Sequence, residues 1–338
     1  MNFAIVGCGF ISKKHVAAID NISEAKLVAV CDRVEESMKP FIESHQVDAY
    51  IELNEMLKDT TIDVVAICVP SGFHKDVALQ VAAAKKHIII EKPIAMSIED
   101  ADEITKAANK NGVKLIVVHP NRYRPVVMEL KKLLDNNKFG KISHANCLVN
   151  WNRGQEYYDQ APWRGTKEHD GGVLMNQAIH NLDLLLWFIG TPKEVISMEA
   201  TRLRDIEAED VSCGIVRFED GILANIQAST TVYPKNYEES ITIFGEKGTV
   251  KIGGPNALYF EKIEYSGMDE SLQREINKRI ENDPWGMPGH QQIYLNIIDS
   301  IKNDKETAIT GEEATNALKL VTKMYQSASS KSIVKWDE

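Results

Sequence analysis

Short apolar runs alternate with helical patterns over the first third of the chain. The runs are rich in β-branched residues and comprise Phe3–Val6, Leu27–Cys31, Ala49–Ile51, Val64–Val69, His87–Ile90 and Lys114–Val118. Most are apolar at every position rather than at alternate ones, which is typical of parallel strands covered on both faces. The pattern predicts a doubly wound α/β sheet of parallel strands joined by crossovers, with its ligand crevice at the carboxyl ends of the strands.

Helical signals lie between these runs. Ser12–Ile19 and Asp76–Lys86 carry apolar residues at helical spacing, and Leu53–Lys58 is predicted to form a short helical turn. Ser97-Ile98-Glu99-Asp100 resembles a capping box in which Asp100 replaces the usual glutamate, and Asn111-Gly112 is a typical helix end. These signals supply the crossover helices that a parallel sheet requires.

The pattern changes after residue 120. Val126–Asn136 is an amphipathic helix, Leu174–Ile189 is an apolar one, and His290–Lys302 and Glu312–Ser327 are predicted to close the chain. Longer strands of alternating character are predicted at Ile142–Trp151, Val195–Arg204, Val211–Phe218, Leu223–Thr231, Ser240–Phe244 and Thr249–Ile252. We therefore expect a dinucleotide-binding domain over residues 1–120 and an α+β domain with a large, mostly antiparallel sheet over residues 121–338.

The composition narrows the class of protein. A length of 338 residues suits two domains, and a net charge of -10 argues against a nucleic-acid partner or an anionic membrane surface. No apolar run approaches the roughly 20 residues that cross a bilayer, and the first residues read as a strand rather than a signal peptide. The five cysteines are scattered without metal-ligand spacing. A reduced, cytoplasmic protein is the expectation.

The first strand leads into a glycine-rich turn, Gly7-Cys8-Gly9-Phe10-Ile11-Ser12, and then a helix. In the Rossmann fold Gly7 would permit the tight turn, and Gly9 would let the backbone approach a pyrophosphate at the helix N-terminus. Ser12 stands where glycine or alanine is usual. Alone the motif is weak, because an ordinary strand–turn–helix can carry the same glycines.

Asp32 strengthens the case for a dinucleotide. It ends the second strand, where a carboxylate can accept hydrogen bonds from the adenosine ribose hydroxyls and would repel a 2′-phosphate. NAD is therefore favoured over NADP. Arg33 argues the other way, since a guanidinium there can pair with a phosphate or stack on adenine.

Polar residues follow the later strands at the same end of the predicted sheet. Pro70-Ser71-Gly72-Phe73-His74 follows the fourth strand, Glu91-Lys92-Pro93 the fifth, and His119-Pro120-Asn121 the sixth. A lysine after an isoleucine run can be a surface residue whose stem covers apolar atoms. At this position, however, the Lys92 ammonium can reach both the nicotinamide ribose and a substrate hydroxyl.

These residues carry a resemblance to a known family. The chain resembles the glucose–fructose oxidoreductase and inositol dehydrogenase family, called Gfo/Idh/MocA. The motifs that carry it, in chain order, are GCGFIS at 7–12, EKP at 91–93, NRY at 121–123, WRG at 163–165 and GGVLMNQAIHNLD at 171–183. They span both expected domains. The resemblance specifies the family and leaves the substrate open.

The resemblance implies an active site of Lys92, Asn176 and His180. His180 would take the hydroxyl proton while a hydride leaves the same carbon for the nicotinamide, and Lys92 would position the hydroxyl. Many relatives have aspartate where this chain has Asn176, which puts in doubt any scheme that needs a carboxylate partner for His180.

The motifs and the resemblance together assign the contacts. Cofactor contacts are expected from Gly7, Cys8, Gly9, Phe10, Ile11, Asp32, Arg33, Pro70, Ser71, His74, Glu91, Lys92, Asn121, Trp163 and Arg164. Substrate contacts are expected from Lys92, Tyr123, Arg153, Tyr157, Asn176 and His180.

The stretch from Trp151 to Arg164 gathers aromatic and guanidinium groups, which suit sugars, bases and phosphates. Some of these residues fit a purely structural loop as well. The stretch, with YPKNYEES at 233–240, resembles relatives that oxidise UDP-N-acetylated amino sugars, or their uronic acids, at carbon 3.

Other functions stay open at this point. An inositol or free-sugar dehydrogenase, a glycoside hydrolase that recycles its NAD, and a non-catalytic NAD-binding regulator all fit the fold. A metal site is not expected, because the nine histidines show no HExxH spacing. Family members usually pair through the open face of the C-terminal sheet, so the resemblance implies a homodimer or homotetramer.

Overall fold

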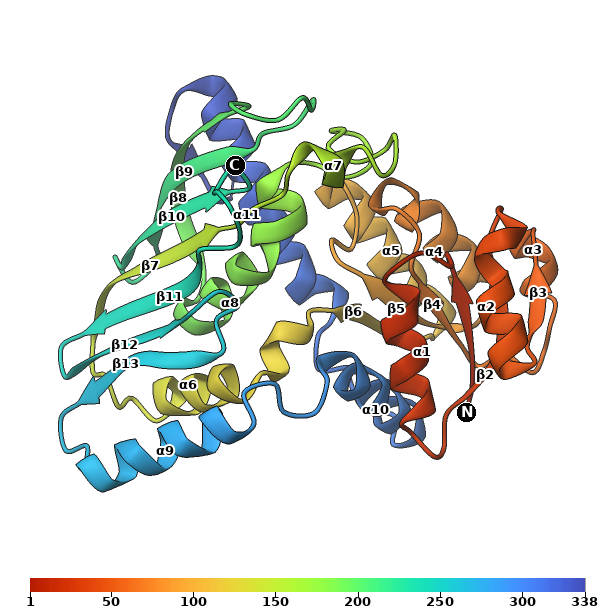
Figure 1. Ribbon diagram of the computed structural model, residues 1–338, viewed down its shortest axis with the longest axis horizontal. Helices are drawn as coiled ribbons and strands as arrows, with labels where there is room; N and C mark the ends of the chain where they lie inside the picture. Colours follow the sequence, from red (N-terminus) through yellow and green to blue (C-terminus); the bar gives the residue numbers. More distant parts are fainter. Residues whose placement is uncertain (338) are drawn as a thin grey trace. The chain divides into compact units, whose positions relative to one another are not determined.

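The computed structural model describes residues 1–337, which form two compact units. The first comprises Met1–Pro120 and Pro288–Leu318, and the second comprises Asn121–Met287 and Lys319–Glu338. The expected second domain, 121–338, therefore needs a correction, because Pro288–Leu318 belongs with the first unit. The reason is burial: α10 (Gly289–Lys302) buries Ile293, Tyr294 and Ile297 and packs on α1 (Ser12–Asp20). Figure 1 shows α10, in blue, beside α1, in red.

The first unit contains the predicted doubly wound sheet. Its six strands have the order β3-β2-β1-β4-β5-β6, and every pair is parallel. The strands are β1 (Asn2–Val6), β2 (Lys26–Cys31), β3 (Asp48–Tyr50), β4 (Val64–Ile67), β5 (His87–Glu91) and β6 (Leu115–Val118). The strand order reverses between β1 and β4, which is where ligands bind in folds of this class.

Helices connect these strands. They are α1, α2 (Glu35–His45), α3 (Leu53–Met56), α4 (His74–Ala83) and α5 (Ile98–Asn111), with a 3₁₀ turn at Ser71–Phe73. The Ser97 side chain accepts the Asp100 N–H at the start of α5, and Gly112 ends the helix at a φ of 68°, as the capping signals predict. The sequence pattern did not single out α2.

The second unit contains an eight-stranded sheet of order β13-β12-β11-β7-β10-β9-β8-β14. Its strands are β7 (Ile142–Asn150), β8 (Pro192–Ala200), β9 (Val211–Phe218), β10 (Leu223–Ser229), β11 (Glu238–Gly245), β12 (Gly248–Gly253), β13 (Tyr259–Tyr265) and β14 (Val334–Lys335). Only the pair β7 and β10 is parallel among the named pairs, so the predicted mostly antiparallel sheet is confirmed. β13 and β14 are additions to the predicted strands.

Helices cover one face of this sheet. The helices of this unit are α6 (Pro125–Asp135), α7 (Gln155–Tyr158), α8 (Ile179–Ile189), α9 (Glu270–Asn282) and the later turns of α11 (Gly311–Ser330), of which α9 packs on β13. α8 packs on β7 and β11 (Figure 1). On β9 the side chains of Val216 and Phe218 are buried, whereas Ile215 is 51% exposed. The alternation buries one face of β9 and leaves the other open.

Candidate active site

The glycine-rich turn joins β1 to α1. Gly7 has a φ of +91°, and a Cβ there would lie 2.7 Å from the carbonyl carbon of Cys68 and the nitrogen of Val69, so only glycine fits. A Cβ at Gly9 would meet nothing within 4 Å. The turn therefore packs tightly against β4 on one side and exposes its backbone at Gly9.

Asp32 follows β2 and ties this turn to the second strand. Its Oδ2 accepts the Cys8 N–H at 2.7 Å, and its Oδ1 accepts the Val34 N–H at 2.8 Å. The carboxylate is thus fixed beside the glycine-rich turn, where an adenosine ribose is bound in this fold. Arg33 is exposed.

The start of α1 suits a pyrophosphate. The residue that precedes the helix, Ile11, makes no side-chain cap, and the Ser12 hydroxyl donates to the Gly9 carbonyl at 2.6 Å, away from the helix N–H groups. Backbone donors and the positive end of the helix dipole therefore face the turn that Gly9 leaves open. Phe10, 78% exposed, lies on the turn itself. These residues fit an NAD cofactor.

His74 lies inside the first unit. Its Nδ1 is 2.8 Å from the Pro93 carbonyl oxygen, and its Nε2 is 3.0 Å from that of Val69. Burial lowers the pKa of His74, so the neutral ring donates to one of these two carbonyls at a time. This predicted cofactor residue links the ends of β4 and β5. Pro70 and Ser71, beside it, are half-buried.

Glu91 is buried, although it was predicted to contact the cofactor. Its Oε1 lies 3.0 Å from His15 Nε2 and 3.2 Å from His290 Nε2, and its Oε2 accepts the Lys92 N–H at 3.2 Å. The Tyr294 hydroxyl is 3.0 Å from His15 Nδ1. The network fixes the end of β5, where half-buried Lys92 follows, to α1 and α10.

The charge state of this network follows from its contacts. Burial alone would raise the pKa of Glu91, but hydrogen bonds from His15 and His290 hold that pKa well below its ordinary value. Burial lowers the pKa of His15. Glu91 is therefore a carboxylate held by imidazole N–H donors, with the Tyr294 hydroxyl donating to His15.

The same three side chains form a possible metal-ligand set that the sequence did not suggest. The ligand atoms of His15, Glu91 and His290 all lie within 4.8 Å of one another. Each imidazole Nε2 already has Glu91 Oε1 as its hydrogen-bond partner, so the cluster is satisfied without an ion.

In the second unit, a π-helical turn at Leu174–Ala178 precedes α8. Asn176 and His180 lie four residues apart, and both are half-buried, whereas the other residues from 173 to 179 are buried. The two predicted catalytic residues therefore share the accessible side of the helical segment formed by this turn and the start of α8. Insertions of this π type are frequent at functional sites.

Glu209 holds the start of this helical segment. Its side chain accepts the Leu174 N–H at 2.9 Å and the Tyr325 hydroxyl at 3.0 Å, and its carbonyl accepts the Val173 N–H at 3.0 Å. A Cβ at Gly172 would lie 1.9 Å from Glu209 Oε2, which explains the glycine. Glu209 could not be predicted from the sequence, because a lone acidic residue before a strand carries no signal of this contact.

Asp170 was also missed. It is 4% exposed, its Oδ2 accepts the Gly165 N–H at 2.7 Å, and the Asn176 Nδ2 donates to its Oδ1 at 2.5 Å. A buried carboxylate therefore contacts the residue that stands where many relatives have aspartate. Its place directly before Gly171-Gly172 is the one signal that could have pointed to it.

Arg153 and Tyr157, predicted to contact the substrate, lie beside Trp163 and Arg164, which were predicted to contact the cofactor. The Arg164 guanidinium is 4.3 Å from the Tyr157 ring centre and 4.7 Å from that of Trp163, and it donates to the Tyr157 hydroxyl at 2.6 Å. Arg153 lies 5.0 Å from the Trp151 ring and 5.4 Å from the Tyr157 ring. This set is the aromatic–guanidinium cluster.

One residue of the NRY motif, Arg122, has a structural role. Arg122 makes a two-point ion pair with Asp183 of α8, with Nε to Oδ2 at 2.8 Å and an NH2 contact to Oδ1 at 2.7 Å. Both side chains are buried. Asn121, predicted to contact the cofactor, is 8% exposed, and Tyr123 is half-buried.

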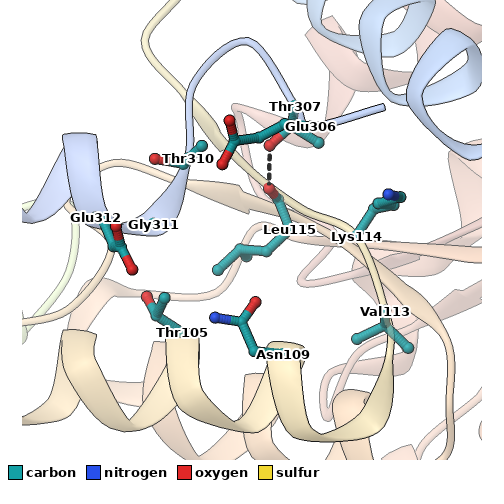
Figure 2. Close-up of a pocket in the computed structure, with 10 residues that line it drawn as sticks. All are labelled: Thr105, Asn109, Val113, Lys114, Leu115, Glu306, Thr307, Thr310, Gly311 and Glu312. Carbon is teal, nitrogen blue, oxygen red and sulfur yellow. Dashed lines mark hydrogen bonds between the residues drawn. The ribbon is translucent and has the colours of Figure 1, made fainter. Parts of the chain in front are cut away.

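A polar pocket of about 280 Å³ lies elsewhere in the first unit. Figure 2 shows Thr105 and Asn109 of α5 facing it, with the Thr307 hydroxyl donating to the Leu115 carbonyl at 2.6 Å. Leu115 begins β6, so the pocket is at the amino ends of the strands. None of the predicted site residues lines it.

The first unit has a Rossmann sheet with a glycine-rich turn and a fixed carboxylate after β2. The second unit presents an accessible histidine. These features are typical of NAD-dependent oxidoreductases. The chain belongs to the Gfo/Idh/MocA family. Residues 1–119 match the family model described as "Oxidoreductase family, NAD-binding Rossmann fold", and residues 131–336 match its "C-terminal alpha/beta domain". The predicted family, enzyme class and NAD cofactor are thereby confirmed.

Solved structures and a curated relative resemble the chain over nearly its whole length. The WlbA dehydrogenase of Chromobacterium violaceum, in complex with NADH and UDP-GlcNAcA, is 37% identical with a TM-score of 0.94, covering 99% of this chain and 95% of that one. The WlbA dehydrogenase of Bordetella pertussis, with the same ligands, is 36% identical with a TM-score of 0.94 and coverage of 99% and 97%. Myo-inositol 2-dehydrogenase of Thermotoga maritima is 26% identical, covering 100% and 99%.

Within residues 1–337, no helix is both long and apolar enough to span a membrane.

Proposed function

We propose that the protein oxidises a secondary hydroxyl, at carbon 3, of a UDP-N-acetylated hexosamine or its uronic acid, with NAD as oxidant. The similarity to a dehydrogenase crystallised with NADH and UDP-GlcNAcA, 37% identical over 99% of this chain, carries the proposal. Inositol dehydrogenase relatives are more distant, at 26% identity.

The chemistry requires a hydride acceptor and a base. When bound, NAD supplies the acceptor, and oxidation of the alcohol releases one proton with the hydride. His180 is assigned as the base, because it is half-buried at the start of α8 while residues 177–179 before it are buried, and an imidazole there can take the hydroxyl proton. Lys92, fixed at its backbone by Glu91, is assigned to position the hydroxyl and stabilise alkoxide charge.

The aromatic–guanidinium cluster suits a nucleotide sugar. Planar guanidinium groups bind phosphate oxygens in pairs, and aromatic faces stack on uracil or on sugar C–H groups. Asn176 Nδ2 lies 3.5 Å from the Tyr157 hydroxyl, so the cluster adjoins the proposed catalytic side chains within the second unit. Arg153 and Arg164 are the groups that we assign to the diphosphate.

The test is an absorbance assay at 340 nm with NAD and NADP against UDP-GlcNAc, its uronic acid form, myo-inositol and glucose. NAD reduction with a UDP-sugar alone is the expected result. Turnover of inositol or glucose alone would keep the dehydrogenase and remove the nucleotide-sugar substrate. Glycoside cleavage without net reduction would favour the NAD-recycling hydrolase instead.

The open face of the eight-stranded sheet is proposed to pair with a second copy of the chain. Ile196 lies directly opposite Ile215 across β8 and β9, and Met198, 78% exposed, lies on the same face. Exposed apolar side chains grouped in this way are typical of an interface. Light scattering should give a dimer or tetramer, and a monomer at working concentration would refute the pairing.

A further inference from the structure

Glu209 supplies two acceptors to the start of the helical segment that carries Asn176 and His180. Its carbonyl oxygen accepts the Val173 N–H at 3.0 Å, and its Oε1 accepts the Leu174 N–H at 2.9 Å. The first N–H groups of a helix have no acceptor within the helix, so their partners must come from elsewhere. Here both partners belong to one residue that is distant in the sequence.

Glu209 is itself held in place. The next residue, Asp210, donates its N–H to the Ala200 carbonyl at 3.2 Å, and the Tyr325 hydroxyl donates to Glu209 Oε1 at 3.0 Å. Glu209 is 6% exposed, and its carboxyl group lies directly against Gly172, where a Cβ would be 1.9 Å from Oε2. Packing and hydrogen bonds therefore fix this carboxyl group, and it can in turn fix the backbone that it contacts.

The segment between this contact and α8 has the wider π-helical form, at Leu174–Ala178. At its far end it continues into α8, which packs on β7 and β11. A π-helical turn contains more residues than an α-helical turn, so the angle between Asn176 and His180 about the helix axis differs between the two forms. Because π-helical turns are rare, this one needs a restraint at its start as well as at its end. The Glu209 contacts supply that restraint.

We propose that Glu209 is a positioning residue for the oxidation, which caps the Val173 and Leu174 N–H groups and so keeps the π-helical turn in the form that aligns Asn176 with His180. The proposal rests on the proposed function, because it concerns the alignment of the groups that meet the sugar hydroxyl. Glu209 is buried and acts through the backbone of the turn.

Two substitutions separate the hydrogen bond from the volume of the side chain. Glu209→Gln keeps an oxygen for the Leu174 N–H, whereas Glu209→Leu keeps a similar volume and removes that oxygen. Misaligned catalytic groups should lower kcat for the UDP-sugar by about 10- to 100-fold in Glu209→Leu. In Glu209→Gln, kcat should stay within about threefold of wild type, because the acceptor is conserved.

Binding should respond less than chemistry in Glu209→Leu. The KM for the UDP-sugar should change by no more than about threefold, since the substitution leaves the aromatic–guanidinium cluster intact. The Kd for NADH should stay within about twofold, since the glycine-rich turn belongs to the first unit. A loss confined to kcat distinguishes misalignment from a general loss of folded protein, and a loss confined to KM would overturn the proposal.

Glu207→Leu is the matched control. Glu207 is exposed in the same connection between β8 and β9, and its Oε2 accepts the Lys167 N–H at 3.0 Å. The substitution therefore removes the same kind of hydrogen bond without changing the start of the helical segment. Its kcat should stay within about twofold of wild type. Equal losses of kcat in Glu207→Leu and Glu209→Leu would overturn the proposal.

Wild-type kcat in a folded Glu209→Leu would also overturn it, as would a Glu209→Gln variant that is equally impaired. If Glu209→Leu does not fold, Glu209→Asp decides, because it keeps the carboxylate but shortens its reach toward Leu174 by one methylene. Its kcat should fall by about tenfold, and an unchanged kcat would contradict the cap. Failure of Glu209→Asp to fold as well would count against the proposal, since Glu209 would then act on stability rather than on alignment.

If wild type oxidises no UDP-sugar, the proposed function fails separately, and the cap is tested on the turn itself. The Asn176 backbone N–H donates to the Gly172 carbonyl at 3.0 Å, so its amide resonance reports the form of the turn. In protein with isotopically labelled asparagine, this resonance is identified by its absence from Asn176→Asp. It should shift in Glu209→Leu and keep its position in Glu209→Gln. An unchanged resonance in Glu209→Leu would overturn the cap.

Discussion

Glu209 accepts the Leu174 N–H at 2.9 Å, at the start of the helical segment that carries Asn176 and His180. The Tyr325 hydroxyl donates to the same carboxylate oxygen at 3.0 Å. Burial raises the pKa of Glu209 to about 7, despite these donors. The helical segment that carries the proposed catalytic residues is therefore held at its start by a group, the Glu209 carboxyl, that titrates near neutral pH.

The raised pKa makes stability depend on pH with a defined sign. The folded protein holds the Glu209 proton more tightly than the unfolded chain, so this contribution is complete below the ordinary glutamate pKa of 4.5 and is lost as pH rises through about 7. Glu209→Gln keeps an acceptor and does not titrate. Between pH 5 and pH 8, wild type should lose about 2.5 kcal/mol of unfolding free energy relative to Glu209→Gln in urea titrations. If the unfolding free energies of wild type and Glu209→Gln depended on pH in the same way, the raised pKa of Glu209 would be contradicted.

The two glycines of the turn should respond differently to the same change. Gly7→Ala forces a side chain into a φ of +91° and to 2.7 Å from the backbone at Cys68, so it should cost about 2 kcal/mol or more of stability. Gly9→Ala meets nothing within 4 Å and should fold normally, but its methyl group would stand where the pyrophosphate approaches.

Thermal melts and NADH titration check both variants. Gly9→Ala should keep the wild-type melting temperature and weaken NADH binding by about tenfold or more. Unchanged NADH affinity in Gly9→Ala would remove the turn from the cofactor site.

The Glu91 network should limit acid stability. Because hydrogen bonds from His15 and His290 hold the pKa of Glu91 well below its ordinary value, its contribution is present above pH 4.5 and is lost as pH falls below it. Glu91→Leu leaves two buried imidazole donors without their acceptor and should cost about 3 kcal/mol or more. Tyr294→Phe removes only the hydroxyl contact to His15 and should cost about 1 kcal/mol.

Acid and urea unfolding curves give these values, with Glu43→Gln on the exposed side of α2 as the control. An equal loss of unfolding free energy in Glu91→Leu and in the control would show that the Glu91 network does not contribute to stability.

The parts of the fold that the sequence predicts are those with local signals. β5 buries three consecutive isoleucines, and Ser97 with Gly112 marks both ends of α5. α9 was missed because it buries only Ile276 and Ile280 on an otherwise charged helix. The return of Pro288–Leu318 to the first unit depends on packing against distant elements, which periodicity does not record.

The residues of the candidate site also fall into two groups, those that lie in local sequence motifs and those that are placed by long-range contacts. Lys92, Asn176 and His180 lie in motifs and could be named in advance. The residues that support them could not, because Glu91 meets partners 76 and 199 residues away and Glu209 contacts Tyr325 across 116 residues. Hydrogen bonds at such separations leave no periodic trace in one sequence.

His180→Ala should separate chemistry from cofactor binding. The glycine-rich turn and Asp32 belong to the first unit, so NADH affinity should not change when an imidazole is removed from the second. Turnover of the UDP-sugar should fall by about 10²- to 10⁴-fold, which is the usual contribution of a general base. His144→Ala, an exposed histidine stacked on Phe244 in the same unit, is the matched control and should retain activity. Stopped-flow turnover and NADH fluorescence provide the two readouts, and near-normal turnover in His180→Ala would remove this residue from the mechanism.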